Sequence, residues 1–188
     1  MWYRKMLADS KRDKAELDNV DVTLISELQV DGRASLVKLG RKIGLKHSSV
    51  RERLLKIIKN NYIRVQANVN LKSLGYRVVF AGFEVVGYES AINLMNKLKS
   101  CPRTLLVGFT SGEFNVIALM IVEDLDALRM FIERHLRPIA DIRRISINFG
   151  EIVYPEFIPT PPLEKIREFA ERNCLSCELF VRRGDSHE

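Results

Sequence analysis

Two segments with helical spacing lie in the stretch LVKLGRKIGLKHSSVRERLLKIIK, residues 36–59. In the first segment Leu36, Leu39 and Ile43 recur with the spacing of one buried helix face, and Gly44 can adopt the left-handed conformation that ends a helix. The second segment has an apolar face of the same kind, made by Val50, Leu54, Ile57 and Ile58. Two helices joined by a glycine-containing turn, the second basic on its outer face, predict a helix-turn-helix.

A further helix and a strand flank this pair. Asp18 precedes an apolar set with helical spacing, and Asp21 follows three residues later, which is typical of a capped helix over residues 19–30. Beyond the basic helix, apolar and polar residues alternate from Ile63 to Val69, and this alternation predicts a strand. Residues 17–70 are therefore predicted to form a winged helix-turn-helix.

The strongest chemical signal is the charge between Arg33 and Gln66. This stretch carries ten Lys or Arg residues and one acidic residue, Glu52, so its formal charge is +9, whereas the whole chain carries +6. The rest of the chain therefore sums to −3 (6 − 9). A cationic segment of one sign on a helix-turn-helix pattern is typical of a protein that neutralises phosphates. Double-stranded DNA is the expected partner.

The candidate DNA contacts divide by their position on the basic helix and its flanks. Side chains near the helix start can reach base edges in the major groove, and the other cations are placed to hold phosphates. The predicted base readers are Ser48, Ser49, Arg51 and Arg53. The predicted phosphate contacts are Arg33, Lys38, Arg41, Lys42, Lys56 and Arg64. Lys46 and His47, at the helix start, complete the predicted set; the alternative is an ordinary solvated helix face.

The second half of the chain alternates between strands and helices. Strand-like runs and helical spacings follow one another in the order βαββαβ, which is the ferredoxin-like arrangement. We therefore predict an α+β protein whose second domain covers residues 77–154, after a hinge at 71–76. Residues 155–188 form a C-terminal extension that begins with a proline-rich extended linker, and within it Leu163 to Arg172 has helical spacing. Residues 1–16 are a polar N-terminal arm.

The sheet of the second domain is predicted to have one face that its helices leave uncovered. Helices on one side can cover only the residues that point that way, yet apolar residues occupy both faces of the strands. These residues are Phe80, Phe83, Val107, Phe109, Ile117 and Leu119. A second subunit is the simplest cover, so we predict a homodimer through this domain.

Composition and motifs argue against several other classes of protein. No run approaches the roughly 18 consecutive apolar residues of a membrane helix, and the start of the chain is too charged for a signal peptide, so we expect a cytoplasmic protein without membrane contact. Cys174 and Cys177 could donate half of a zinc site or form a redox pair, but no second such pair accompanies them. We predict no metal, no cofactor and no catalytic residues, since nucleophile-elbow, phosphate-loop and HExxH motifs are missing.

Four segments resemble the helix-turn-helix signature of the Lrp/AsnC (feast/famine) transcriptional regulators. They are Leu17–Asp21, Leu28–Arg33, Leu39–Leu45 and Val50–Leu54. The resemblance continues to residue 154, and it implies a second domain that binds a small effector and assembles subunits into a dimer, with an octamer left open. The chain departs from the family at Lys46, which stands where a capping serine is usual.

In this family small amino acids bind around the hairpin that joins the two central strands. The corresponding segment here runs from Gly108 to Asn115. The resemblance implies an effector site at Gly108, Thr110, Ser111, Gly112 and Asn115. Asn115 stands where the family often has aspartate, so a charge that could meet an effector's ammonium group is lost.

Two alternatives remain open from the sequence. Siroheme decarboxylases resemble the same family and would make the chain an enzyme, although such an enzyme does not need so one-sidedly basic a segment. A non-DNA assembly module would show no salt-dependent binding of DNA. We favour a sequence-specific DNA-binding transcriptional regulator that responds to an amino acid or another small effector.

Overall fold

The computed structural model describes residues 17–136, 139 and 141–171. The predictions for the N-terminal arm, for Cys174 and Cys177 and for the end of the extension lie outside these residues. No helix in the described part of the chain is long and apolar enough to cross a membrane.

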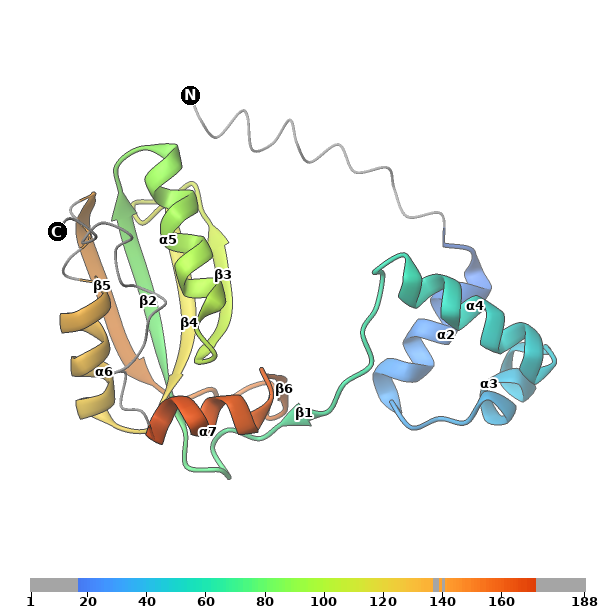
Figure 1. Ribbon diagram of the computed structural model, residues 1–188. Coiled ribbons are helices and arrows are strands. Elements are labelled where there is room, and N and C mark those ends of the chain that lie inside the picture. The colour runs from blue at the N-terminus through green and yellow to red at the C-terminus, as the bar shows by residue number, and fades with distance from the viewer. Residues whose placement is uncertain (1–16, 137–138, 140, 172–188) are drawn as a thin grey trace, which may run out of the picture. The chain divides into compact units, whose positions relative to one another are not determined.

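The described chain divides into two compact units between Ala67 and Asn68 (Figure 1). The first unit consists of α2 (Asn19–Val30), α3 (Leu36–Ile43) and α4 (His47–Lys59). Its buried centre takes one residue from each helix: Leu24, Leu39 and Val50. The predicted helix-turn-helix is therefore confirmed, with α2 packed on the pair as the apolar spacing predicts.

Side-chain caps fix where the first two helices begin. The Asp18 carboxylate accepts a hydrogen bond from the backbone N–H of Asp21 at 2.8 Å, and the Asp21 carboxylate accepts one from the Asp18 N–H, which completes a capping box at the start of α2. The Ser35 hydroxyl accepts from the N–H of Lys38 at 3.2 Å and caps α3. Each cap satisfies a backbone donor that the helix itself leaves unpaired.

The turn between α3 and α4 needs glycine at two positions. Gly44 ends α3 with a φ of 72°, in the left-handed region that side chains rarely adopt. Gly40 is limited by space instead, because a Cβ there would lie 2.4 Å from the carbonyl oxygen of Leu45. These two glycines let the chain reverse tightly, and so they set the angle between α3 and α4.

The predicted wing is not formed. Residues 63–67 have no regular structure, and the predicted strand is reduced to β1, Asn68–Val69. β1 pairs with β6, Ile158–Pro159, which belongs to the second unit. Alternation of apolar and polar residues predicts that a segment can be a strand, but the strand forms only where a partner offers hydrogen bonds.

The second unit is built on a four-stranded antiparallel sheet. Its strands are β2 (Arg77–Val85), β3 (Thr104–Phe109), β4 (Val116–Val122) and β5 (Ile142–Gly150), and their order across the sheet is β3-β4-β2-β5. α5 (Tyr88–Ser100) connects β2 to β3. α6 (Leu125–Phe131), continued by the π-helical turn η1 (Ile132–Leu136), connects β4 to β5. This is the predicted βαββαβ order, and the α+β fold class is confirmed.

The six apolar strand residues on which the dimer prediction was based lie on both faces of the sheet. Phe83, Val107 and Phe109 belong to the large core under the helices, together with residues of α5 and α6. On the opposite face, Phe80 and Ile117 are 46% and 38% exposed. They line a shallow apolar hollow of about 550 Å³ with Leu106, Phe114 and Leu119.

The C-terminal segment covers one end of that opposite face. α7 (Leu163–Glu171) follows β6, and its Ile166 is completely buried in a cluster with Val78 of β2 and Ile121 of β4. The helix predicted after the prolines is therefore confirmed. Within the predicted extended segment, Ile158–Pro159 pair with β1 as β6, and Ile158 is buried in the same cluster, so this part packs against the unit.

Candidate nucleic-acid interface

α4 turns its basic side outward. Val50 and Ile57 point inward and are buried, whereas His47, Ser48 and Arg51 are exposed. Because residues four apart lie on the same side of a helix, His47 and Arg51 share one outer surface, and Ser48 is exposed beside them. The first turn of α4 and the residues that follow it are therefore available to a partner.

The inward face of α4 is narrower than the sequence predicts. Leu54 is half-buried, but Ile58 is 43% exposed and so does not belong to the buried stripe. Ser49, one of the predicted base readers, is half-buried. The unit is small, and three helices bury only a narrow stripe of each one.

The start of α4 differs from the starts of the other two helices. Lys46 occupies the cap position and makes no side-chain hydrogen bond to the first turn. The first backbone N–H groups of α4 are thus not satisfied by a cap side chain, and the helix dipole adds positive potential at the same place. A phosphate oxygen is a suitable acceptor for such N–H groups.

Most of the predicted phosphate contacts are exposed cations. Among the ion pairs of the described residues, none includes any of six basic side chains in or beside the helix-turn-helix, and all six are exposed. They are Arg33, Arg41, Lys46, Arg51, Lys56 and Arg64. Glu52 is the one acidic residue between Arg33 and Gln66, so these cations leave a positive surface on this unit.

Lys38 and Lys42 are exposed but paired within the unit. The Lys38 Nζ lies 3.0 Å from Asp31 Oδ2, and Lys42 pairs with Glu27. Their side chains are 64% and 58% exposed, so water and salt screen both pairs. The pairing with Lys38 holds the pKa of Asp31 below its usual value. A phosphate can replace either carboxylate because exposed pairs of this kind are weak.

Arg53 has partners within the unit. Its Nη1 donates to Asp18 Oδ2 at 2.7 Å and to Asp21 Oδ1 at 2.8 Å, so the guanidinium is held against the start of α2. The N–H of Asp21, and after it the Arg53 guanidinium, lower the pKa of Asp18. Both contacts are made by Nη1 alone, and they tie α4 to the start of α2. The predicted contact of Arg53 with a base edge stays a prediction.

Asp18 and Asp21 are the residues whose part in this unit the sequence does not reveal. Their spacing predicts a helix cap, which the structure contains, but it does not predict that both carboxylates also accept from α4. The available signal was a pair of acidic residues that precedes the strongly basic stretch Arg33–Gln66. Such a pair suggests a local cation partner but does not identify which one.

The hairpin between β3 and β4 contains the predicted effector residues. The Thr110 hydroxyl donates to the carbonyl oxygen of Phe114 and accepts from the N–H of Gly112 at 3.2 Å, so it closes the turn. Ser111 and Gly112 are exposed, and Gly108 is half-buried within β3. The turn is thus shaped by Thr110 and presents its tip to solvent.

Asn115 has a structural role in this hairpin. Its Nδ2 donates to the carbonyl oxygen of Val85 at 2.8 Å, and its Oδ1 accepts from the Val85 N–H at 2.9 Å. Both polar atoms of the amide therefore join the hairpin to the end of β2. This structural role explains the residue without an effector, and the contact of Asn115 with an effector stays a prediction.

Both units match domains of one protein family. Residues 17–57 match the AsnC-type helix-turn-helix domain, and residues 78–150 match the Lrp/AsnC ligand binding domain. An uncharacterized HTH-type transcriptional regulator of Pyrococcus horikoshii is 31% identical over 133 residues, which cover 69% of this chain and 83% of that protein. The chain belongs to the Lrp/AsnC family.

A second relative and a solved structure are also similar to this chain. The HTH-type transcriptional regulator Ptr1 of Methanocaldococcus jannaschii is 25% identical over 133 residues, which cover 70% of this chain and 90% of Ptr1. The crystal structure of a transcriptional regulator of Neisseria meningitidis in complex with L-Met has the same fold, with a TM-score of 0.66 and 18% identity, over 80% of this chain and 99% of that one.

Membership in the Lrp/AsnC family confirms the main functional prediction. The chain is a helix-turn-helix transcriptional regulator with a ligand-binding domain. The relatives are named as transcriptional regulators, so the decarboxylase alternative gains no support. The C-terminal segment from residue 151 onward lies outside both matched domains.

Proposed function

We propose that this Lrp/AsnC protein binds double-stranded DNA through the outer side of α4 and acts by binding alone, without catalysis. The observation that carries this proposal is the group of six exposed cations around α3 and α4 that make no ion pair with any described residue. Arg51 is the leading candidate for a base edge, with His47, Ser48 and Ser49 beside it. The other cations hold phosphates, and Lys38 and Lys42 join them by exchanging their carboxylate partners for DNA.

The proposed DNA-binding form is a homodimer. Its subunits associate through the exposed apolar patch around Phe80, Leu106 and Ile117, which a second sheet would remove from water. Two α4 helices related by a two-fold axis would enter successive major grooves about 34 Å apart on a pseudo-palindromic site. Association into an octamer is a further expectation of the same proposal.

The proposed effector site is the tip of the β3–β4 hairpin. Ser111 and Gly112 are exposed there, and Thr110 holds the turn in shape. A Neisseria meningitidis regulator of the same fold is solved with L-Met, so amino acids are the first ligands to test. Binding at this turn would change DNA affinity through the arrangement of the subunits.

Fluorescence anisotropy with DNA from upstream of the protein's own gene tests the DNA-binding proposal. Arg51→Ala should cost about 1–3 kcal/mol of binding to the specific site and reduce discrimination against altered sites. Lys56→Ala should lower the slope of log K against log salt by about one. Lys99→Ala, an exposed lysine of α5 in the other unit, is the control and should change neither quantity. An unchanged affinity in Arg51→Ala, together with an unchanged slope in Lys56→Ala, would refute the proposed surface.

A further inference from the structure

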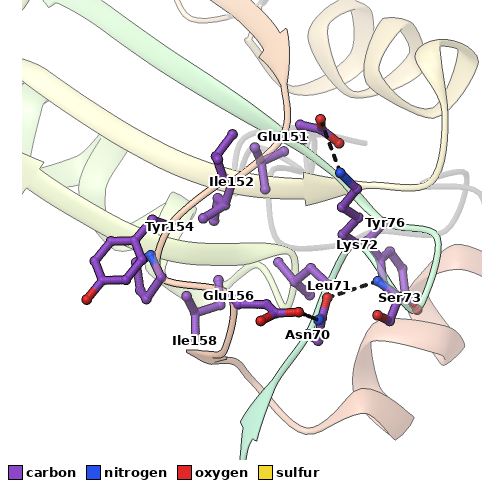
Figure 2. A pocket seen from close by; sticks show the side chains of 13 residues that line it. Asn70, Leu71, Lys72, Ser73, Tyr76, Glu151, Ile152, Tyr154, Glu156 and Ile158 are labelled. Atoms are coloured by element: carbon purple, nitrogen blue, oxygen red, sulfur yellow. Dashed lines mark hydrogen bonds and ion pairs between the residues drawn. The ribbon is translucent and has the colours of Figure 1, made fainter.

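A groove of about 590 Å³ lies in the second unit, beside the segment that leads to the DNA-binding unit (Figure 2). One wall is formed by residues 70–76, which follow β1, and the other by residues 151–158, which join β5 to β6. The second wall lies outside both matched family domains. The groove also shares no residue with the hairpin of the proposed effector site.

One hydrogen bond joins the two walls, and others hold each wall in place. Asn70 Nδ2 donates to Glu156 Oε1 at 2.9 Å, and Asn70 Oδ1 accepts from the N–H of Ser73 at 3.0 Å. Arg77 Nη1 donates to Glu151 Oε2 at 2.9 Å, and β1 pairs with β6 below them. A ligand that enters a groove whose walls are already held loses less free energy to ordering the protein.

The groove has an apolar floor and an apolar rim. Leu71, Val78 and Ile158 are buried beneath it, whereas Tyr154 is 90% exposed and Val153 is 84% exposed at its edge. Figure 2 shows Tyr154 at one end of the groove, with the side chains of Leu71 and Ile158 lying between it and the opposite wall. Large apolar side chains exposed beside a hollow are typical of a surface that binds a partly apolar molecule.

The two carboxylates of the groove have different partners. Glu151 faces two cations, since Arg77 lies at 2.9 Å and the Lys72 Nζ at 3.6 Å. Glu156 differs, because it accepts from the neutral amide of Asn70, and none of the ion pairs of the described residues includes it. A carboxylate that is fixed in place without a counter-ion attracts a cationic group and binds it by a charge-assisted hydrogen bond.

We propose that this groove binds a small molecule with an apolar body and one protonated amine. The ammonium group pairs with Glu156, and the apolar body lies on Leu71 and Ile158 beside Tyr154. Because Asn70 directly follows β1, a bound molecule reinforces the β1–β6 pairing at the point where the chain leaves for the DNA-binding unit. This site is independent of the hairpin site, and its test does not depend on DNA.

Calorimetric titration of the full chain with three probes tests the ligand class. Phenethylamine, phenethyl alcohol and hydrocinnamate share a phenyl body and carry a cationic, a neutral and an anionic head group. Phenethylamine should bind with a millimolar or tighter Kd, the alcohol about ten-fold more weakly or worse, and hydrocinnamate not at all. No heat with millimolar phenethylamine, or equal binding of all three probes, would overturn the proposal.

Two variants then test the position of the site. Glu156→Gln removes the charge but keeps an oxygen that accepts from Asn70, so the affinity for phenethylamine should fall about ten-fold while binding of the alcohol stays the same. Glu164→Gln removes an exposed carboxylate of α7 that does not line the groove, and it should bind all probes like the unaltered protein. Wild-type affinity for the amine in Glu156→Gln would exclude Glu156 as its partner.

Hydrogen exchange provides a second measurement that does not depend on heat. Phenethylamine should slow amide exchange in β1 and β6, because opening their pairing would break the occupied groove. Exchange that is slowed only around the β3–β4 hairpin would place the amine at the proposed effector site instead and would reject the groove.

Discussion

Among single residues of the DNA-binding unit, the two arginines of α4 illustrate how partners decide a role. Arg51 and Arg53 are two positions apart, yet Arg53 binds Asp18 and Asp21 while Arg51 is exposed without an ion pair among the described residues. We expect Arg53→Ala and Asp21→Asn each to lower the free energy of unfolding, and the double variant to lower it by less than the sum, because the two residues share one interaction. Urea denaturation of the four proteins measures this coupling.

Measurements of DNA binding distinguish this positioning role of Arg53 from direct contact between Arg53 and DNA. Arg53→Ala should weaken binding by loosening α4, but the salt slope should stay the same because Arg53 neutralises no phosphate. Asp21→Asn should have a similar effect although it removes a negative charge, which a purely electrostatic role cannot explain. A salt slope lowered by about one in Arg53→Ala would return Arg53 to the DNA surface.

The cap of α2 should also make the stability of this unit depend on acid. The pKa of Asp18 is lowered from 3.8 by the N–H of Asp21 and then by Arg53, so near that pH the folded unit binds fewer protons than the unfolded chain. The contribution is fully present above 3.8 and is lost as the pH falls through the lower folded value. Denaturation at about pH 5 and about pH 3 should show a smaller loss for Asp18→Asn than for the unaltered protein. An equal loss in both would mean that other carboxylates cause the dependence.

At the scale of helices and strands, the elements that were predicted well are those with local signals. Asp18, Ser35 and Gly44 mark helix ends through hydrogen bonds and φ angles within a few residues, so the helix-turn-helix can be read from the sequence. A strand was predicted over Ile63–Val69, but its reduction to β1 and the pairing of β1 were not, because the partner Ile158–Pro159 is distant in the chain and alternation does not identify a partner. The pair of Arg53 with Asp21, 32 residues apart, was missed for the same reason.

α7 provides a test of whether the C-terminal segment is part of the second unit. Ile166 is completely buried between the helix and the sheet, so Ile166→Ala should destabilise this unit by about 2–5 kcal/mol through lost burial and the cavity left behind. Arg167→Ala, the adjacent exposed position, should stay within about 0.5 kcal/mol. Chemical denaturation that resolves the unfolding of the two units measures the effect of each variant. Equal effects would mean that α7 adds no stability to the sheet.

For the whole molecule, the sheet face opposite α5 and α6 is the surface through which we expect two copies to associate. Part of this face is already covered by the chain itself. α7 and β6 occupy the end around Val78 and Ile121, so we expect the proposed second subunit to stack on the end around Phe80 and Ile117. Phe80→Asp places a charge in that patch, and an unpaired charge is costly to bury, so we expect sedimentation velocity to show a monomer in place of a dimer.

Leu125→Asp is the matched control for the dimer prediction. It changes an exposed apolar residue at the start of α6, where an acidic residue suits the helix dipole, and it lies away from the patch, so the dimer should persist. The monomeric Phe80→Asp protein should bind a two-site DNA no better than a single half-site, because each molecule then presents one α4. A Phe80→Asp protein that remains dimeric would show that the subunits associate through another surface, and the spacing of about 34 Å between half-sites would then lose its structural basis.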